Sequence, residues 1–307
     1  MSPTLLTTSD LVTRHDVMSF ARSASMEISP HDEALLPALV NRLPLGTTLY
    51  VAHPPKAALS DVIRVASKAQ ALGFRASPHI LARRLASERD LRSALRDLTE
   101  ADVQQVLLVA GDCERPLGKF TSTLEVLASG ALTDMGIASV GVAGHPEGHK
   151  AIGPTKLLSA LEGKQAFAQH TGTKVHIVTQ FGFNPAAVGA WQAHLLKRGV
   201  TLPIHVGIAG PTPLPKLIRF AMQCGIGASL GSLVTNMSAL GNLVRPTIRP
   251  DEMLVGVLRR AASEGFSHIV RPHFFAFGGA IATASWLRAV VDGRFELLES
   301  GELAMTG

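Results

Sequence analysis

Polar side chains recur where short apolar runs of the sequence end. They are Glu27, His53, His79, Asp112, His145, Glu147, His149, Gln180 and His273. Buried polar groups cost free energy unless they are paired, so a set of this size indicates a ligand, a cofactor or a water network that satisfies them. Any one histidine of the set is more commonly a structural residue with its own hydrogen bonds. Taken together, the set predicts one polar site.

Three of these residues suggest acid chemistry beside a flat heterocycle. Glu27 can serve as a general acid if an enclosed, apolar setting raises its pKa. Asp112 and Gln180 offer the acceptors and donors that would orient a ring with both kinds of group, such as a pterin or a flavin. The alternative for Glu27 is an ion pair with a basic neighbour at the rim of the molecule.

Histidine and carboxylate side chains together also suit zinc, iron or manganese. A metal-dependent barrel hydrolase would be expected to carry a His-x-His pair on its first strand, whereas this strand reads Met26-Glu27-Ile28. We therefore expect no metal site.

The elements that must position these residues alternate along the chain. Eight β-branched or apolar runs are separated by helical patterns, which is typical of a parallel sheet. The runs are 24–28, 47–52, 75–80, 105–110, 139–143, 175–181, 203–208 and 268–275. Apolar residues at a spacing of three to four predict helices at 61–72, 88–98, 184–198 and 215–224.

This alternation predicts an α/β fold, a (β/α)₈ TIM barrel. The competing architecture is an open doubly wound sheet, but the first run ends in Glu27-Ile28-Ser29-Pro30 instead of a glycine-rich phosphate loop. The length of 307 residues suits a single barrel domain over 1–307, with residues 1–20 as a helix that covers one barrel end. Catalytic residues of such barrels lie at the carboxyl ends of the strands, where the polar set falls.

Composition narrows the partners and the compartment. The net charge of +5 comes from basic residues scattered through helical stretches, so we expect no nucleic-acid partner. Cys113 and Cys224 are far apart and lack CxxC spacing, and the N-terminus lacks a signal-peptide pattern. No apolar run reaches the length of a membrane helix. We expect a cytoplasmic protein without a membrane partner, and a homo-oligomer is neither required nor excluded.

At the strand ends the chain resembles the methylenetetrahydrofolate reductase family, which consists of flavoprotein barrels. The resemblance extends thinly from about Met26 to Phe277 and rests on the order of several short stretches. They are Ser25-Met26-Glu27-Ile28-Ser29-Pro30, Ser77-Pro78-His79, Gly111-Asp112, His145-Pro146-Glu147-Gly148-His149, Val178-Thr179-Gln180-Phe181, Gly207-Ile208 and His273-Phe274-Phe275. Ala52, Ala110, His145, Lys216 and Gly279 depart from the family pattern.

The resemblance implies flavin-dependent reduction of 5,10-methylenetetrahydrofolate to 5-methyltetrahydrofolate, with FAD as cofactor and NADH or NADPH as hydride donor. Glu27 matches the general acid, Asp112 matches an aspartate beside flavin and pterin, and Gln180 matches a glutamine that contacts nicotinamide and folate. The implied cofactor-binding residues are His53, His79, Asp112, Ala143, Gly144, His145, His149 and Lys164. The implied folate-binding residues are Gln180, Lys216, Phe220 and Phe275.

Two other functions stay open at this point. One is a flavin-free barrel that uses the same pterin pocket for folate-dependent methyl transfer or demethylation. The other is a folate-binding subunit without catalysis. The choice between NADH and NADPH also stays open, because no acidic residue that reads the ribose can be placed outside a dinucleotide fold.

Overall fold

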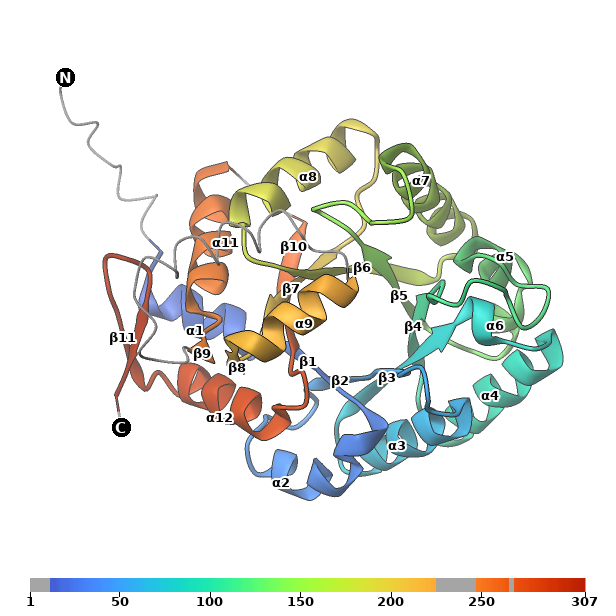
Figure 1. Ribbon diagram of the computed structural model, residues 1–307, viewed down its shortest axis with the longest axis horizontal. Helices are drawn as coiled ribbons and strands as arrows, with labels where there is room; N and C mark the ends of the chain where they lie inside the picture. The colour runs from blue at the N-terminus through green and yellow to red at the C-terminus, as the bar shows by residue number, and fades with distance from the viewer. Residues whose placement is uncertain (1–11, 225–246, 265–267, 307) are drawn as a thin grey trace.

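Eight parallel strands close into a barrel in the computed structural model, which describes residues 12–224, 247–264 and 268–306 (Figure 1). The barrel strands are β1 Ser25–Ile28, β2 Thr48–Val51, β3 Arg75–Leu81, β4 Gln105–Val109, β5 Ser139–Gly144, β6 Lys174–Gly182, β7 Ile204–Ala209 and β10 Ile269–Phe275. Each predicted strand agrees with an observed one to within one residue at either end, so the predicted (β/α)₈ barrel is confirmed.

The strands follow one another around the barrel in the order β1-β10-β7-β6-β5-β4-β3-β2, and β2 pairs with β1 to close it. Every barrel pairing is parallel. All carboxyl ends therefore meet at one rim, called the mouth below. Glu27 of β1 is in register with Tyr50 of β2 and Phe275 of β10, which places these three side chains at neighbouring positions.

Helices surround the barrel. They are α1 Arg14–Arg22, α2 Leu36–Val40, α3 Leu59–Ala71, α4 Glu88–Glu100, α5 Thr123–Ala128, α6 Ala131–Asp134, α7 Pro154–Thr171, α8 Pro185–Lys197, α9 Leu214–Cys224, α11 Asp251–Glu264 and α12 Ala280–Val291. Two 3₁₀ helices, η2 Pro30–Leu35 and η3 Ala82–Arg84, and two short hairpins complete the described chain; the hairpins pair β8 Thr212–Pro213 with β9 Thr247–Ile248 and β11 Phe295–Leu297 with β12 Leu303–Met305. The four helices predicted from apolar spacing are present within two residues of their expected ends.

Of the helix expected within residues 1–20, the described chain shows α1, which begins at Arg14 after the N-cap Thr13; residues 1–11 lie outside the described residues. Helix α1 packs against α11, α12 and β10, and it leads into β1 after a two-residue link. None of the helices in the described ranges is both long and apolar enough to cross a bilayer.

The main hydrophobic core lies between the barrel and the helices, and the space inside the barrel is unusually polar. A separate small group, Tyr50, Leu107 and Val178, is the apolar filling of the interior. Around it the side chains of Ser25, Ser77, His176, His205 and His273 are buried. Barrels of this type are usually filled by branched aliphatic residues, so this interior departs from the common pattern.

Hydrogen bonds satisfy much of this interior. The Tyr50 hydroxyl is hydrogen-bonded to His176 Nε2 at 2.8 Å and lies 3.3 Å from His205 Nδ1. Ser25 Oγ is hydrogen-bonded to His273 Nδ1 at 3.0 Å. His273 therefore lies in the middle of the barrel and not at its mouth, because the strand continues through Phe274 and Phe275.

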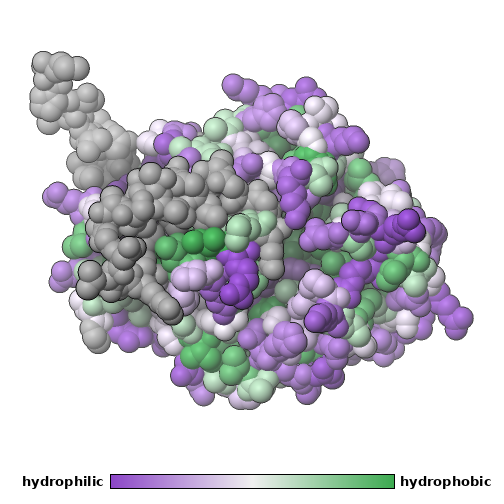
Figure 2. All heavy atoms as spheres, viewed as in Figure 1, coloured by the Kyte–Doolittle hydropathy of each residue, from purple (hydrophilic) through white to green (hydrophobic). Residues whose placement is uncertain are grey.

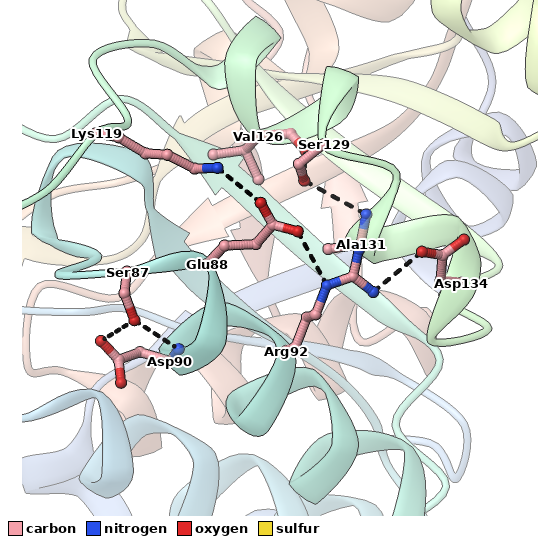
Figure 3. A network of polar contacts seen from close by, with 9 residues as sticks. All are labelled: Ser87, Glu88, Asp90, Arg92, Lys119, Val126, Ser129, Ala131 and Asp134. Atoms are coloured by element: carbon pink, nitrogen blue, oxygen red, sulfur yellow. Dashed lines mark hydrogen bonds and ion pairs between the residues drawn. The ribbon is translucent and has the colours of Figure 1, made fainter.

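On the outside, charged side chains tie neighbouring segments together. Arg92 of α4 contacts Glu88 and Asp134 at 3.0 Å each, and Lys119 contacts Glu88 at 2.7 Å (Figure 3). Pairs this exposed contribute little stability, with a median of about 0–1 kcal/mol. They show that Arg92 has two carboxylate partners.

Candidate active site at the barrel mouth

Glu27 has a largely buried carboxyl group that makes no hydrogen bond within the described protein. Its side chain is 20% exposed at the end of β1. Burial raises the pKa of Glu27 to about 8, and the negative charge of nearby Asp32 adds to the effect. The carboxyl is therefore protonated at neutral pH, and its O–H is available to a ligand.

His79 of β3 lies beside Glu27. Its Nε2 lies 3.6 Å from Glu27 Oε2, too long for a hydrogen bond. Burial lowers the pKa of His79 to about 3, with a further effect from His53, so the ring is neutral at pH 7. The two side chains do not form an ion pair there, and His79 Nε2 is buried without a hydrogen-bond partner. The alternative of an ion pair between Glu27 and a basic neighbour would need a protonated His79, which its lowered pKa disfavours.

His53 belongs to the loop that follows β2. Its Nε2 lies 3.1 Å from the carbonyl oxygen of Ala57, which also accepts a hydrogen bond from Arg84. Burial and the charge of Arg84 lower the pKa of His53 to about 4. Its Nδ1 is buried without a partner, so two ring nitrogens, one from His53 and one from His79, have no protein partner on this side of the mouth.

Gln180 lies where strand β6 is irregular. The register of β6 against β7 shifts between Val178 and Phe181, as at a β-bulge. Gly207 of β7 packs into this irregularity, because a Cβ there would lie 2.5 Å from the Thr179 carbonyl oxygen, and its N–H donates to Thr179 Oγ1 at 2.8 Å. Bulges next to active sites re-aim side chains, and here the bulge positions the half-buried Gln180.

Asp112 is less enclosed than the resemblance implies. It follows Gly111, whose φ of +92° turns the chain after β4, and its side chain is exposed. It makes no hydrogen bond or ion pair within the described residues. The barrel places it on the same rim as Glu27 and Gln180, because all three residues lie at or just after the carboxyl ends of parallel strands. No direct contact joins these three residues.

The part of the mouth near β5 and α7 holds the other residues that the resemblance matches to a cofactor. His145 packs edge-on against His149, with 5.0 Å between ring centroids, and burial lowers the pKa of His145 to about 4. Lys164 of α7 is 6% exposed, and burial lowers its pKa to about 8. Ala143 is half-buried, whereas a Cβ on Gly144 would lie 2.8 Å from Trp191, so Gly144 packs against α8.

Aromatic side chains line the mouth on the side opposite His53 and His79. We call them the aromatic wall. Phe220 of α9 stacks on Phe277 with 4.7 Å between ring centroids, and Phe277 lies 4.9 Å from Phe181 and 6.0 Å from Phe275. Helix α9 lies across the front of the barrel in Figure 1, and its Leu217 and Ala221 pack in the same apolar cluster. Lys216 lies beside this wall, since a Cβ on Gly278 would lie 3.2 Å from its Nζ.

Phe277 and Phe181 are missing from the set expected from the sequence. Phe277 has a φ of +48°, a left-handed conformation that is rare for a bulky residue and is often found at functional sites. The alternation of Phe275 and Phe277 in the segment 273–279 is the signal that could have revealed the wall.

A metal site has little support in this part of the chain. Among residues 12–224, 247–264 and 268–306, no three His, Cys, Asp or Glu side chains are grouped so as to hold an ion.

Hydrophilic side chains cover much of the described surface on the face with α9, with hydrophobic ones in smaller groups (Figure 2).

Comparison with known proteins supports the fold. No protein-family model matches the sequence. The chain is similar to a solved structure of an uncharacterised protein from Clostridium thermocellum, which is described as binding two copies of 5-methyl-5,6,7,8-tetrahydrofolic acid. The TM-score is 0.57, and the identity is 12% over 90% of this chain and 98% of that one. A weaker similarity is to dihydropteroate synthase from Thermus thermophilus, with a TM-score of 0.46 and 13% identity over 86% and 91% of the two chains. At 12% identity, the similarity to the Clostridium thermocellum protein shows a shared fold alone.

Proposed function

We propose that the chain binds a reduced folate at the barrel mouth and reduces 5,10-methylenetetrahydrofolate to 5-methyltetrahydrofolate. The observation that carries the proposal is Glu27, a carboxyl that keeps its proton at neutral pH and has no acceptor in the described protein. A general acid has to be protonated at working pH and able to reach its substrate, and Glu27 has the first property because of its burial.

The walls of the mouth suit a flat, two-faced ligand. The rings of Phe220, Phe275 and Phe277 supply apolar stacking surface on one side. Gln180 supplies an amide on the same rim, with N–H donors and an Oε1 that also accepts a hydrogen bond from the Phe181 N–H at 3.1 Å. A pterin ring has stacking faces and an edge with both kinds of group, so this combination favours a folate. The Clostridium thermocellum barrel, described as binding a reduced folate, is an example of this class of ligand on a similar fold.

In the proposed reaction Glu27 donates its proton to N10 of the folate, so that the bridging carbon stays on N5. This breaks the bond from N10 to the bridging carbon and leaves an iminium on N5. Hydride addition to that carbon then yields the methyl group. Glu27 is left as a carboxylate and regains its proton from solvent. Gln180 holds the ring, and the aromatic wall excludes water from it.

A flavin would fit on the side of the mouth formed by β2, β3 and β5. His53 Nδ1 and His79 Nε2 are buried there without partners, and polar ring edges could satisfy them. Lys164, together with His145 and His149, would face the charged part of such a cofactor. Bound FAD would supply the hydride that it receives from NADH or NADPH.

The composition and turnover of the purified protein test this proposal. A flavoprotein would show absorbance near ~450 nm that NADH or NADPH bleaches, and methylenetetrahydrofolate would restore it. A colourless protein that binds 5-methyltetrahydrofolate would instead support folate-dependent methyl transfer or a non-catalytic folate-binding role. A protein that binds neither flavin nor folate would contradict the proposal.

A further inference from the structure

A cavity at the opposite end of the barrel is lined by arginines that have no acidic partner. Its volume is about 160 Å³, and residues from α1, β2, β3 and β10 and from the segment before β2 line it. The lining residues that carry the argument are Arg22, Thr48, Arg75 and Arg271. The cavity lies where the strands begin, so it is separated from the mouth by the packed interior of the barrel.

The strand order explains why these residues meet. The four segments β10, β1, β2 and β3 are consecutive around the barrel. Arg271 precedes His273, which is in register with Ser25, and Arg22 precedes Ser25 by three residues. Thr48 is in register with both Ser25 and Arg75. Three guanidinium groups from distant parts of the sequence are thus directed to one cavity by the pairing of the strands.

Arg271 is the most unusual of the three. Its Nε is buried and has no hydrogen-bond partner. Its positive charge acts on His176 inside the barrel. The pKa of His176 is lowered to about 4, mainly by burial and to a smaller extent by Arg271. The Arg271 side chain is half-buried, so leaving its charge without an anion costs free energy, and the neutral rings around it supply no negative charge. A ligand that supplies that charge would remove the cost.

The other arginines of the cavity also lack carboxylate partners within the described ranges. Arg22 and Arg75 are exposed on its rim and make no ion pair there. In contrast, Arg64, Arg92, Arg198, Arg249, Arg260 and Arg288 each contact an Asp or a Glu. Arg22, Arg75 and Arg271 thus bring three cations without a carboxylate partner among the described residues to one cavity.

We propose that this cavity binds a phosphate group through Arg22, Arg75 and Arg271. Guanidinium groups match the oxygens of a tetrahedral oxyanion through paired N–H donors, and three positive charges suit a dianion better than a single carboxylate. The Thr48 hydroxyl, which lines the cavity and makes no other hydrogen bond within the described chain, adds a donor. The volume of about 160 Å³ accommodates a phosphate group.

Calorimetric titration with inorganic phosphate at constant ionic strength tests the proposal. The wild-type chain should bind phosphate, and its melting temperature should rise with phosphate but not with equivalent sodium chloride. Arg271→Met and Arg75→Gln should each weaken binding by about tenfold or more, because each removes charged hydrogen bonds. Arg75 is exposed, so its variant reports on the cavity even if Arg271→Met does not fold. Glycerol phosphate in a parallel titration distinguishes free phosphate from the terminal phosphate of a larger molecule.

Two controls separate this site from others. Arg89→Gln removes an exposed arginine of α4 and should leave the phosphate affinity unchanged. Lys164→Met alters the mouth and should also leave it unchanged, so phosphate binding there would not be mistaken for binding in the cavity. The proposal is overturned if wild-type protein shows no phosphate-specific effect, or if Arg75→Gln binds phosphate as tightly as the wild type does.

Discussion

The protonated state of Glu27 can be tested through protein stability, without any assumption about substrate. Glu27→Gln keeps the size and polarity of the side chain but cannot ionise. In the unfolded chain the wild-type carboxyl has an ordinary pKa of 4.5, whereas in the folded protein the pKa is about 8. The folded state therefore disfavours the carboxylate, and wild-type stability should fall as the pH rises from 4.5 through 8.

The size of this effect follows from the two pKa values. The difference between 4.5 and about 8, at about 1.4 kcal/mol for each unit, gives an upper value of about 5 kcal/mol. Because the Glu27 side chain keeps 20% of its exposure, solvent reduces this value, and we expect about 2–5 kcal/mol. The variant should gain this much stability over the wild type by pH 8 and nothing further above it.

Urea unfolding of both proteins between about pH 5 and pH 9 measures the difference. The buried histidines titrate in both proteins, so their contribution cancels. Glu296→Gln, on the exposed hairpin strand β11, is the matched control and should show no such trend. A difference between Glu27→Gln and wild type that stays constant over this range would refute the reasoning, since the carboxyl would then have an ordinary pKa.

Three further changes have expected outcomes. Burial lowers the pKa values of His79, His176 and His273 to about 3–4, so these rings stay neutral in the fold. The free energy of unfolding should therefore drop as the pH falls below the unfolded pKa of 6.5, by about 1.4 kcal/mol per pH unit for each ring. Urea unfolding at several pH values measures this drop, and a free energy of unfolding that does not change with pH would contradict it. Gly207→Ala would place a Cβ 2.5 Å from the Thr179 carbonyl oxygen, so it should destabilise the protein by about 1–3 kcal/mol in thermal unfolding, and an unchanged melting temperature would show that the bulge adapts. Phe277→Leu should weaken folate binding about tenfold in a calorimetric titration, because it removes the ring stacked on Phe220, whereas equal affinity would exclude the aromatic wall from the folate site.

The sequence was sufficient to predict the barrel and the location of its mouth. The run 24–28 ends at Ile28 and is followed by Ser29-Pro30, and runs of this kind at regular intervals make β/α alternation the simplest architecture. Glu27, His79 and Gln180 could be assigned to one rim, because parallel strands bring their carboxyl ends together.

The interior of the barrel could not be predicted in the same way. His176 and His205 lie within apolar runs whose two faces are both buried, so the pattern does not reveal which face points inside. His273 looks like a strand-end residue until the length of β10 is known. The cavity lined by Arg22, Arg75 and Arg271 depends on the register of four strands, and no local sequence pattern encodes that register.

The most direct measurement for the proposed function is the rate of methylenetetrahydrofolate reduction by Glu27→Gln, taken together with its folate affinity. If Glu27 supplies the proton, the rate should fall by about 10²- to 10⁴-fold while 5-methyltetrahydrofolate still binds. The wild-type rate should also decline above about pH 8, where Glu27 loses its proton. A variant that reduces the substrate as fast as the wild type does would show that the acid lies elsewhere.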